Sequence, residues 1–116
     1  MHDYKKLNVW KNSMKLVSDI YNFTKKFPKE EVYALTSQIR RSAISIPSNI
    51  SEGAGRSSEK EFNNFLSFSY GSTCELETQL LIAKNLDYIS DIELDMLLND
   101  LYQIQKMIFK LKEKLN

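Results

Sequence analysis

Apolar residues recur at three- and four-residue spacing along four separate stretches of the chain, which is the spacing of one face of an α-helix. The first stretch carries two neighbouring apolar rows, one of Leu7, Trp10, Met14, Val17, Tyr21 and Thr24, the other of Leu16, Ile20, Phe23 and Phe27. This pattern predicts an amphipathic helix over residues 8–26. Pro28 ends it, because the residue before a proline is pushed out of the helical region.

The second stretch predicts a helix over residues 30–54. Its apolar row consists of Leu35, Ile39, Ala43, Ile46, Ile50 and Ala54. Pro28 with Glu30 and Glu31 suits a helix start, since proline is tolerated in the first turn and carboxylates oppose the dipole. Pro47 lies inside the row and costs about 3 kcal/mol locally. Because the row keeps its phase on both sides, we predict one helix kinked at Pro47. We also predict that Gly53 and Gly55 supply left-handed positions that end it.

The third stretch opens on Ser58 and Glu61, the two positions of a capping box, and predicts a helix that runs to about residue 86. Its predicted core row is Phe62, Phe65, Ser69, Ser72, Leu76, Leu80 and Ala83. A second row is small, namely Ser67, Gly71, Cys74 and Thr78. Gly71 in mid-helix costs about 0.5–1 kcal/mol relative to alanine, so we expect another helix to approach closely there.

The fourth stretch repeats the capping signature at Ser90 and Glu93 and predicts a helix over residues 91–115. It holds an unbroken heptad alternation of Leu94, Leu97, Leu101, Ile104, Ile108, Leu111 and Leu115. Such alternation is typical of coiled-coil packing. Leu98, Tyr102 and Phe109 lie off that seam and predict a second contact surface.

Four helices joined by short connections predict an all-α fold, an antiparallel up-down-up-down four-helix bundle formed by residues 1–116 as a single domain. In this topology both chain ends lie at the same end of the bundle. The composition agrees with a globular chain, since apolar residues make up 42% and charged residues 27%.

A polar row accompanies the apolar row of the second helix. It consists of Gln38, Ser42, Ser45, Asn49, Glu52 and Arg56. One interpretation is a solvated flank, and another is a ligand site. We favour a device for register or assembly that lies against Ser67, Gly71, Cys74 and Glu75 or at a subunit seam. The residues assigned to this structural or assembly role are Gln38, Ser45, Pro47, Asn49, Glu52, Gly53, Arg56, Gly71 and Glu75.

Enzyme and cofactor signals are absent from the sequence. The single histidine and single cysteine, His2 and Cys74, make neither a zinc set nor a disulfide. Gly53 and Gly55 follow a predicted helix rather than a strand and lack the spacing of a phosphate-binding loop. We therefore expect no catalytic, cofactor or metal residues. The chain has no run of about 18 apolar residues and no apolar signal core, which predicts a cytoplasmic protein without a membrane span.

Charge is unevenly distributed although the net charge is only +1. Residues 1–41 hold nine basic and four acidic side chains, residues 42–105 three and ten, and residues 106–116 four and one. If the chain ends meet, they form a basic surface, although a solvated surface explains the same pattern. The candidates for binding nucleic acid or a partner are Lys5, Lys6, Lys11, Lys15, Arg40, Arg41, Lys110, Lys112 and Lys114.

Two strings, FPKEEVYALTSQIRRSAISIPSNISEGAGR and SSEKEFNNFLSFSYGSTCELETQL, carry a resemblance that extends from Trp10 to the closing leucine-rich helix. They resemble the bacterial four-helix-bundle family of 23S ribosomal RNA intervening-sequence proteins, although that family usually has alanine at the position of Ser51. The resemblance implies a ring-shaped homopentamer. A related protein, the accessory variability determinant of diversity-generating retroelements, is a similar pentamer that binds a reverse transcriptase and nucleic acid. That relative is conspicuously basic, whereas this chain is nearly neutral.

The sequence and the resemblance together predict a non-enzymatic, oligomeric scaffold, a pentamer by the resemblance. It would bind RNA or a nucleic-acid-processing protein through a basic surface. The alternative is an accessory module that binds protein and makes no contact with nucleic acid.

Overall fold

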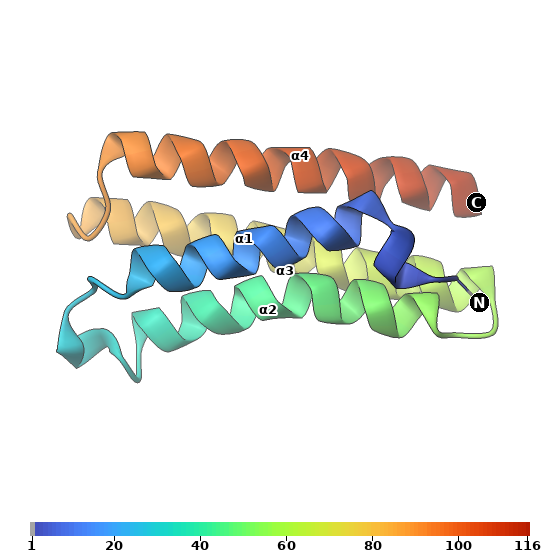
Figure 1. Cartoon of the computed structure of the whole chain (residues 1–116), viewed down its shortest axis with the longest axis horizontal. Coiled ribbons are helices and arrows are strands. Elements are labelled where there is room, and N and C mark those ends of the chain that lie inside the picture. Colours follow the sequence, from blue (N-terminus) through green and yellow to red (C-terminus); the bar gives the residue numbers. More distant parts are fainter. Residues whose placement is uncertain (1) are drawn as a thin grey trace.

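Four long helices run antiparallel in a computed structural model that describes residues 2–116. They are α1 (Asn8–Thr24), α2 (Leu35–Ala54), α3 (Glu59–Asn85) and α4 (Asp91–Leu115), with two short 3-10 helices, η1 (Tyr4–Lys6) and η2 (Lys29–Glu31). Figure 1 shows that successive helices reverse direction and that both chain ends lie at one end of the bundle. The predicted all-α, up-down-up-down bundle is confirmed.

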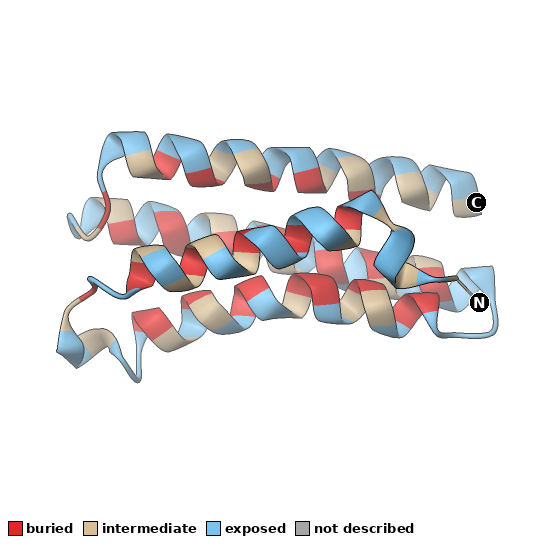
Figure 2. Cartoon of the chain, in the orientation of Figure 1, coloured by how far each residue is buried: buried red, intermediate tan, exposed pale blue. Residues whose placement is uncertain are grey.

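The core is a single apolar layer to which all four helices contribute (Figure 2). The heptad row of α4 is confirmed, since its members from Leu94 to Ile108 are buried and Leu111 and Leu115 are partly buried. In α1 the core contains Leu16 and Ile20, whereas Met14 of the other predicted row is 44% exposed. The second of the two predicted apolar rows therefore forms the buried face of α1.

Helix α2 begins later than predicted, at Leu35 rather than near Glu30. Pro28 and the two glutamates do start a helical turn, but it closes as the 3-10 helix η2, and Ala34 leaves helical geometry at φ −124° and ψ −108°. Glu31 then serves two neighbours. Its Oε1 accepts a hydrogen bond from the Leu35 amide at 3.3 Å, and its Oε2 accepts one from the Tyr88 hydroxyl at 2.8 Å.

Helix α2 runs through Pro47 without interruption, as predicted, while the kink at Pro47 stays a prediction. The predicted left-handed glycines are wrong, because among residues 2–116 the positive φ belongs to Asp87, in the connection from α3 to α4. Gly53 serves close packing instead. A Cβ at Gly53 would lie 2.6 Å from the Phe65 Cβ, so only glycine lets the two helices meet here.

A seam of small polar side chains joins α2 to α3. The Ser42 hydroxyl donates to Glu75 Oε1 at 2.5 Å, and the Ser45 and Ser72 hydroxyl oxygens are 2.7 Å apart. The buried Ser69 hydroxyl donates to the Ile46 carbonyl at 2.9 Å. Polar groups that would be costly to bury unpaired are thus satisfied across the seam.

Of the polar row of α2, Ser42 and Ser45 therefore face α3, whereas Gln38, Glu52 and Arg56 are exposed. Asn49 Nδ2 donates to the carbonyl and hydroxyl of Ser45, on the same helix, at 2.9 and 3.0 Å. Successive residues of a helix are turned by about 100°, so Gly71, two residues after Ser69, lies on nearly the opposite side of α3. A Cβ at Gly71 would meet nothing within 4 Å. The expected close approach of another helix of this chain at Gly71 is wrong, and Ser67 and Cys74 are likewise exposed.

Candidate nucleic-acid interface at the terminal end

Both chain ends are attached to the turn between α2 and α3. The His2 amide donates to the Ala54 carbonyl at 2.8 Å and so satisfies one acceptor at the end of α2. The His2 Nε2 atom lies 2.9 Å from Glu59 Oε1, and the centre of the His2 ring lies 4.8 Å from that of the Phe62 ring. At the other terminus, Asn63 of α3 hydrogen-bonds the Asn116 side chain. The predicted meeting of the chain ends is confirmed, and His2 is packed against α3.

Two lysines of α4, Lys110 and Lys114, lie beside the first turn of α1. A hollow of about 380 Å³ is lined by Leu7, Asn8 and Val9 of the α1 start and by Met107, Lys110, Leu111 and Lys114 of α4. Lys5 and Lys11 flank this turn along the chain and are exposed at the same end of the bundle, but they do not line the hollow, and η1, which carries Lys5, packs against α1 and α2. We call Lys5, Lys11, Lys110 and Lys114 the terminal lysine cluster. Within residues 2–116 none of the four takes part in an ion pair.

Three further lysines among the predicted binding residues are engaged within the bundle. Lys6 lies 4.0 Å from Asp3 Oδ2. Lys15 lies 2.9 Å from Asp19 and 3.8 Å from Asp100, and its hydrogen bond to Asp19 raises the pKa of its ammonium group. Lys112 contacts the Ser67 hydroxyl and the Asn63 carbonyl and so fastens α4 to α3.

The two predicted arginines lie apart from the terminal lysine cluster. Arg40 stands in the second turn of α2, a helix that starts at the end of the bundle opposite the chain ends (Figure 1). Its guanidinium lies 4.4 Å from the Tyr21 ring centre and donates to Thr24 Oγ1 at 2.9 Å. Arg40 thus ties α2 to the last turn of α1, and Arg41 beside it is exposed. The predicted basic residues therefore do not form one continuous surface.

Carboxylates occupy the other side of the terminal end. Glu52 forms an ion pair with Arg56 at 3.2 Å. The Arg56 guanidinium also lies 4.8 Å from the Phe65 ring centre. Glu59 and Glu61 follow in the first turn of α3, where they oppose the helix dipole. The terminal end is thus basic along α1 and α4 and mixed in charge along the turn from α2 to α3.

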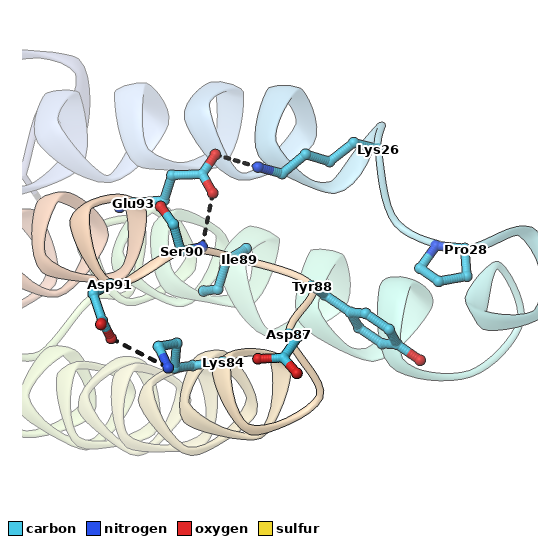
Figure 3. A pocket seen from close by; sticks show the side chains of 9 residues that line it. All are labelled: Lys26, Pro28, Lys84, Asp87, Tyr88, Ile89, Ser90, Asp91 and Glu93. Carbon is cyan, nitrogen blue, oxygen red and sulfur yellow. Dashed lines mark hydrogen bonds and ion pairs between the residues drawn. The ribbon is translucent and has the colours of Figure 1, made fainter.

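The opposite end of the bundle holds a hollow of about 720 Å³ whose charges are directed at one another (Figure 3). Lys26 contacts Glu93, and Lys84 lies 3.2 Å from Asp91. The hydrogen bond from Lys26 holds the pKa of the Glu93 carboxyl below its ordinary value. Glu93 also accepts from the Ser90 amide and completes the capping box of α4. These pairs fasten the start of α4 to the end of α3 and to the connection after α1, and of the charged side chains in the lining Asp87 alone has no ion pair among the described residues.

One further basic residue escaped the sequence prediction. Lys106 lies with Tyr102 and Phe109 in a groove beside α3, where Tyr102 is 41% and Phe109 57% exposed. The off-seam position of the two aromatic residues was a usable signal, and it predicted this second surface. Lys106 could have been found because it stands four residues after Tyr102 and three before Phe109, on the same helix face.

Within residues 2–116, no group of three histidine, cysteine, aspartate or glutamate side chains converges as a metal site would require. Cys74 is free and exposed. None of the helices described here combines the length and apolar character needed to traverse a bilayer.

Comparison with known proteins places this geometry in a family. No curated protein matches the chain. A crystal structure from Bacteroides thetaiotaomicron, described as a protein with unknown function from the S23 ribosomal protein family, superimposes with a TM-score of 0.82 at 26% identity, covering 88% of this chain and 95% of that one. The sequence model of the family described as 23S rRNA-intervening sequence protein matches residues 5–110. The chain therefore belongs to the 23S rRNA-intervening sequence protein family.

Proposed function

We propose that the chain is a non-enzymatic, oligomeric scaffold that binds the phosphate backbone of RNA through the terminal lysine cluster. The observation that carries the proposal is that Lys110 and Lys114 line one hollow at the terminal end and that Lys5 and Lys11 are exposed at the same end. None of the four has a carboxylate partner among residues 2–116. Lysines that bind phosphates release the counterions condensed on a nucleic acid, which favours binding at low salt. The same lysines paired with carboxylates would gain far less.

The family supports this choice of partner in its printed description, which names an intervening sequence of 23S rRNA. Phosphate contacts carry no sequence information, and neither the sequence nor the cluster presents a base-reading motif. The proposed binding is therefore directed at RNA shape and charge and not at a defined sequence.

Self-association would multiply a weak single site. The outer side of α3 is exposed and largely uncharged around Gly71, Cys74, Thr78 and Ile82, which suits a contact between copies of the chain. A pentamer, as the resemblance implies, would repeat the lysine cluster around a ring, and linked weak contacts add through effective concentration. Sedimentation equilibrium tests this part of the proposal, and a species of single-chain mass at micromolar concentration would contradict it.

Titration of a labelled structured RNA at about 50 and 200 mM salt tests the RNA part. For roughly four phosphate contacts per site, the affinity should fall on the order of 100-fold between the two salt concentrations. The double variant Lys110→Gln and Lys114→Gln should bind more weakly. Its matched control is Lys25→Gln with Lys29→Gln, an equal charge change at the opposite end of the bundle, which should bind as wild type.

The alternative function, a protein-binding accessory module without nucleic-acid contact, is favoured by the exposed apolar side chains and the excess of carboxylates in residues 42–105. A chain that binds no RNA at either salt concentration would contradict the RNA proposal and leave this alternative. Unchanged binding by the Lys110 and Lys114 double variant would show that the terminal cluster is not the site.

A further inference from the structure

A groove of about 630 Å³ runs along the side of α4 that is turned towards α3. Tyr70 of α3 lines it together with Tyr102, Lys106, Phe109 and Lys110 of α4. The three aromatic side chains are 37%, 41% and 57% exposed in that order. The fold therefore leaves three rings uncovered in one groove, a feature that marks a binding surface more often than a chance arrangement.

Rings and positive charges alternate along this face. Lys106 follows Tyr102 by four residues and precedes Phe109 by three, and Lys110 follows Lys106 by four, so all four share one side of α4. At about 1.5 Å per residue, the two rings stand roughly 10 Å apart along the helix, enough for two separate stacking positions.

The Tyr102 ring is held in place by its hydroxyl, which donates to Glu77 Oε2 at 2.8 Å. That hydrogen bond to a carboxylate raises the pKa of the phenol, because the protonated hydroxyl is the form that donates it. A ring in the groove lining that is fixed at its far end loses less rotational freedom when a ligand binds.

We propose that this groove binds the unpaired bases of single-stranded RNA. The bases stack on Phe109, Tyr102 and Tyr70, and the phosphates lie against Lys106 and Lys110. Aromatic platforms interleaved with cations are the arrangement by which proteins hold single strands without regard to sequence. The inference rests on the proposed function, and Lys110 lines both this groove and the hollow of the terminal lysine cluster, so the two surfaces are continuous.

The remaining groove residues agree with a polynucleotide. The side-chain amides of Asn99, Gln103 and Gln105 line it and can donate to or accept from base edges. Glu113 is a carboxylate in the same groove and opposes phosphate there. The lining holds two lysines and one glutamate, and Glu77 lies beside it on the Tyr102 hydroxyl, so attraction for phosphate is local to Lys106 and Lys110.

Phe68, which packs on Phe65 and is not part of the proposed contact between copies, provides a matched control for Phe109. It is 58% exposed, nearly the same as Phe109, but it packs edge-on against Phe65 at 5.6 Å between ring centres. The guanidinium that lies over the Phe65 ring, that of Arg56, is already paired with Glu52. Removal of either phenyl ring changes the exposed apolar area alike, so only a ring that stacks on RNA distinguishes the two variants.

The experiment titrates wild type, Phe109→Ala and Phe68→Ala with a labelled single-stranded oligouridylate and with a blunt RNA duplex of equal length. Phe109→Ala should weaken oligouridylate binding about 10-fold or more and leave duplex binding and the salt slope unchanged. Phe68→Ala should match wild type on both probes. In Phe109→Trp the affinity should be retained and the added indole emission quenched by the oligouridylate, with the emission of Trp10 in wild type as the reference.

Several results would overturn the inference while leaving the proposed function intact. One is oligouridylate binding by Phe109→Ala equal to wild type while the duplex is still bound. Another is an equal loss on both probes, and a third is dissociation of the oligomer by Phe109→Ala, since a second copy would then cover the groove. Failure of wild type to bind either RNA would contradict the proposed function itself and this inference with it.

Discussion

The substitution Gly53→Ala should destabilise the bundle, although alanine is the better helix former. The added Cβ would lie 2.6 Å from the Phe65 Cβ and 3.0 Å from Phe62 Cδ1. The Phe65 Cβ is fixed to its backbone, so relief requires α3 to move away from α2. Such overpacking costs about 1–3 kcal/mol, against a gain of about 0.5–1 kcal/mol from replacing glycine inside a helix. We expect a net loss of about 1–2 kcal/mol.

Gly55→Ala is the matched control, two residues further along. Gly55 has φ −82°, which any residue adopts, and a Cβ there would meet its neighbours at 3.6 Å, an ordinary contact. This variant should be as stable as wild type or more stable by up to about 1 kcal/mol. Gly53→Ala should lower Tm by roughly 4–8 °C, and Gly55→Ala should not. Thermal unfolding followed by circular dichroism measures both. A Gly53→Ala protein as stable as Gly55→Ala would refute the close-packing role of Gly53.

Three further predictions concern other parts of the bundle. The pKa of Glu93 is lowered in the fold, so its contact with Lys26 stabilises the protein above the ordinary pKa of a glutamate and is lost as pH falls through the pKa of the folded state. Wild type should therefore lose more stability than Glu93→Gln between about pH 6 and pH 3. Equal losses in the two proteins, measured by urea unfolding, would contradict this role of Glu93. Asn49→Leu removes the hydrogen bonds to Ser45 beside the seam and should change the melting temperature or the oligomer size, so a variant unchanged in both would exclude a role in register. Gly71→Ala should stabilise an isolated chain by about 0.5–1 kcal/mol, whereas a lower oligomer mass on sedimentation would instead place Gly71 in a contact between copies.

Sequence periodicity predicted the helices well where burial follows chemical type. The heptad of α4 is the best case, because each buried position carries leucine or isoleucine. In α1 the rule failed at Ser13, a polar residue that is buried because its hydroxyl donates to the Val9 carbonyl at 2.6 Å. Met14 beside it was expected in the core and is exposed. A serine whose hydroxyl is hydrogen-bonded within its own helix can be buried, and a pattern based on hydropathy does not predict this.

The site was predicted in part for a similar reason. Charge counts along the chain located the lysines, and the topology brought the chain ends together. They could not show that Lys15 reaches Asp100, that Lys112 contacts Ser67 or that Arg40 stacks on Tyr21, since these contacts join residues on different helices. The role of Gly53 was hidden likewise, because a glycine at the end of a helix has the same sequence signature whether it caps the helix or lets α3 approach.

The salt dependence of RNA affinity tests the central proposal most directly. We expect log K for a structured RNA to fall linearly with log salt in wild type. In a variant with Lys5, Lys11, Lys110 and Lys114 replaced by glutamine, the slope should be smaller by about 0.9 for each phosphate contact that is lost. An identical slope in the two proteins, or the absence of RNA binding by wild type at about 50 mM salt, would contradict the assignment of the terminal lysine cluster as an RNA-binding surface.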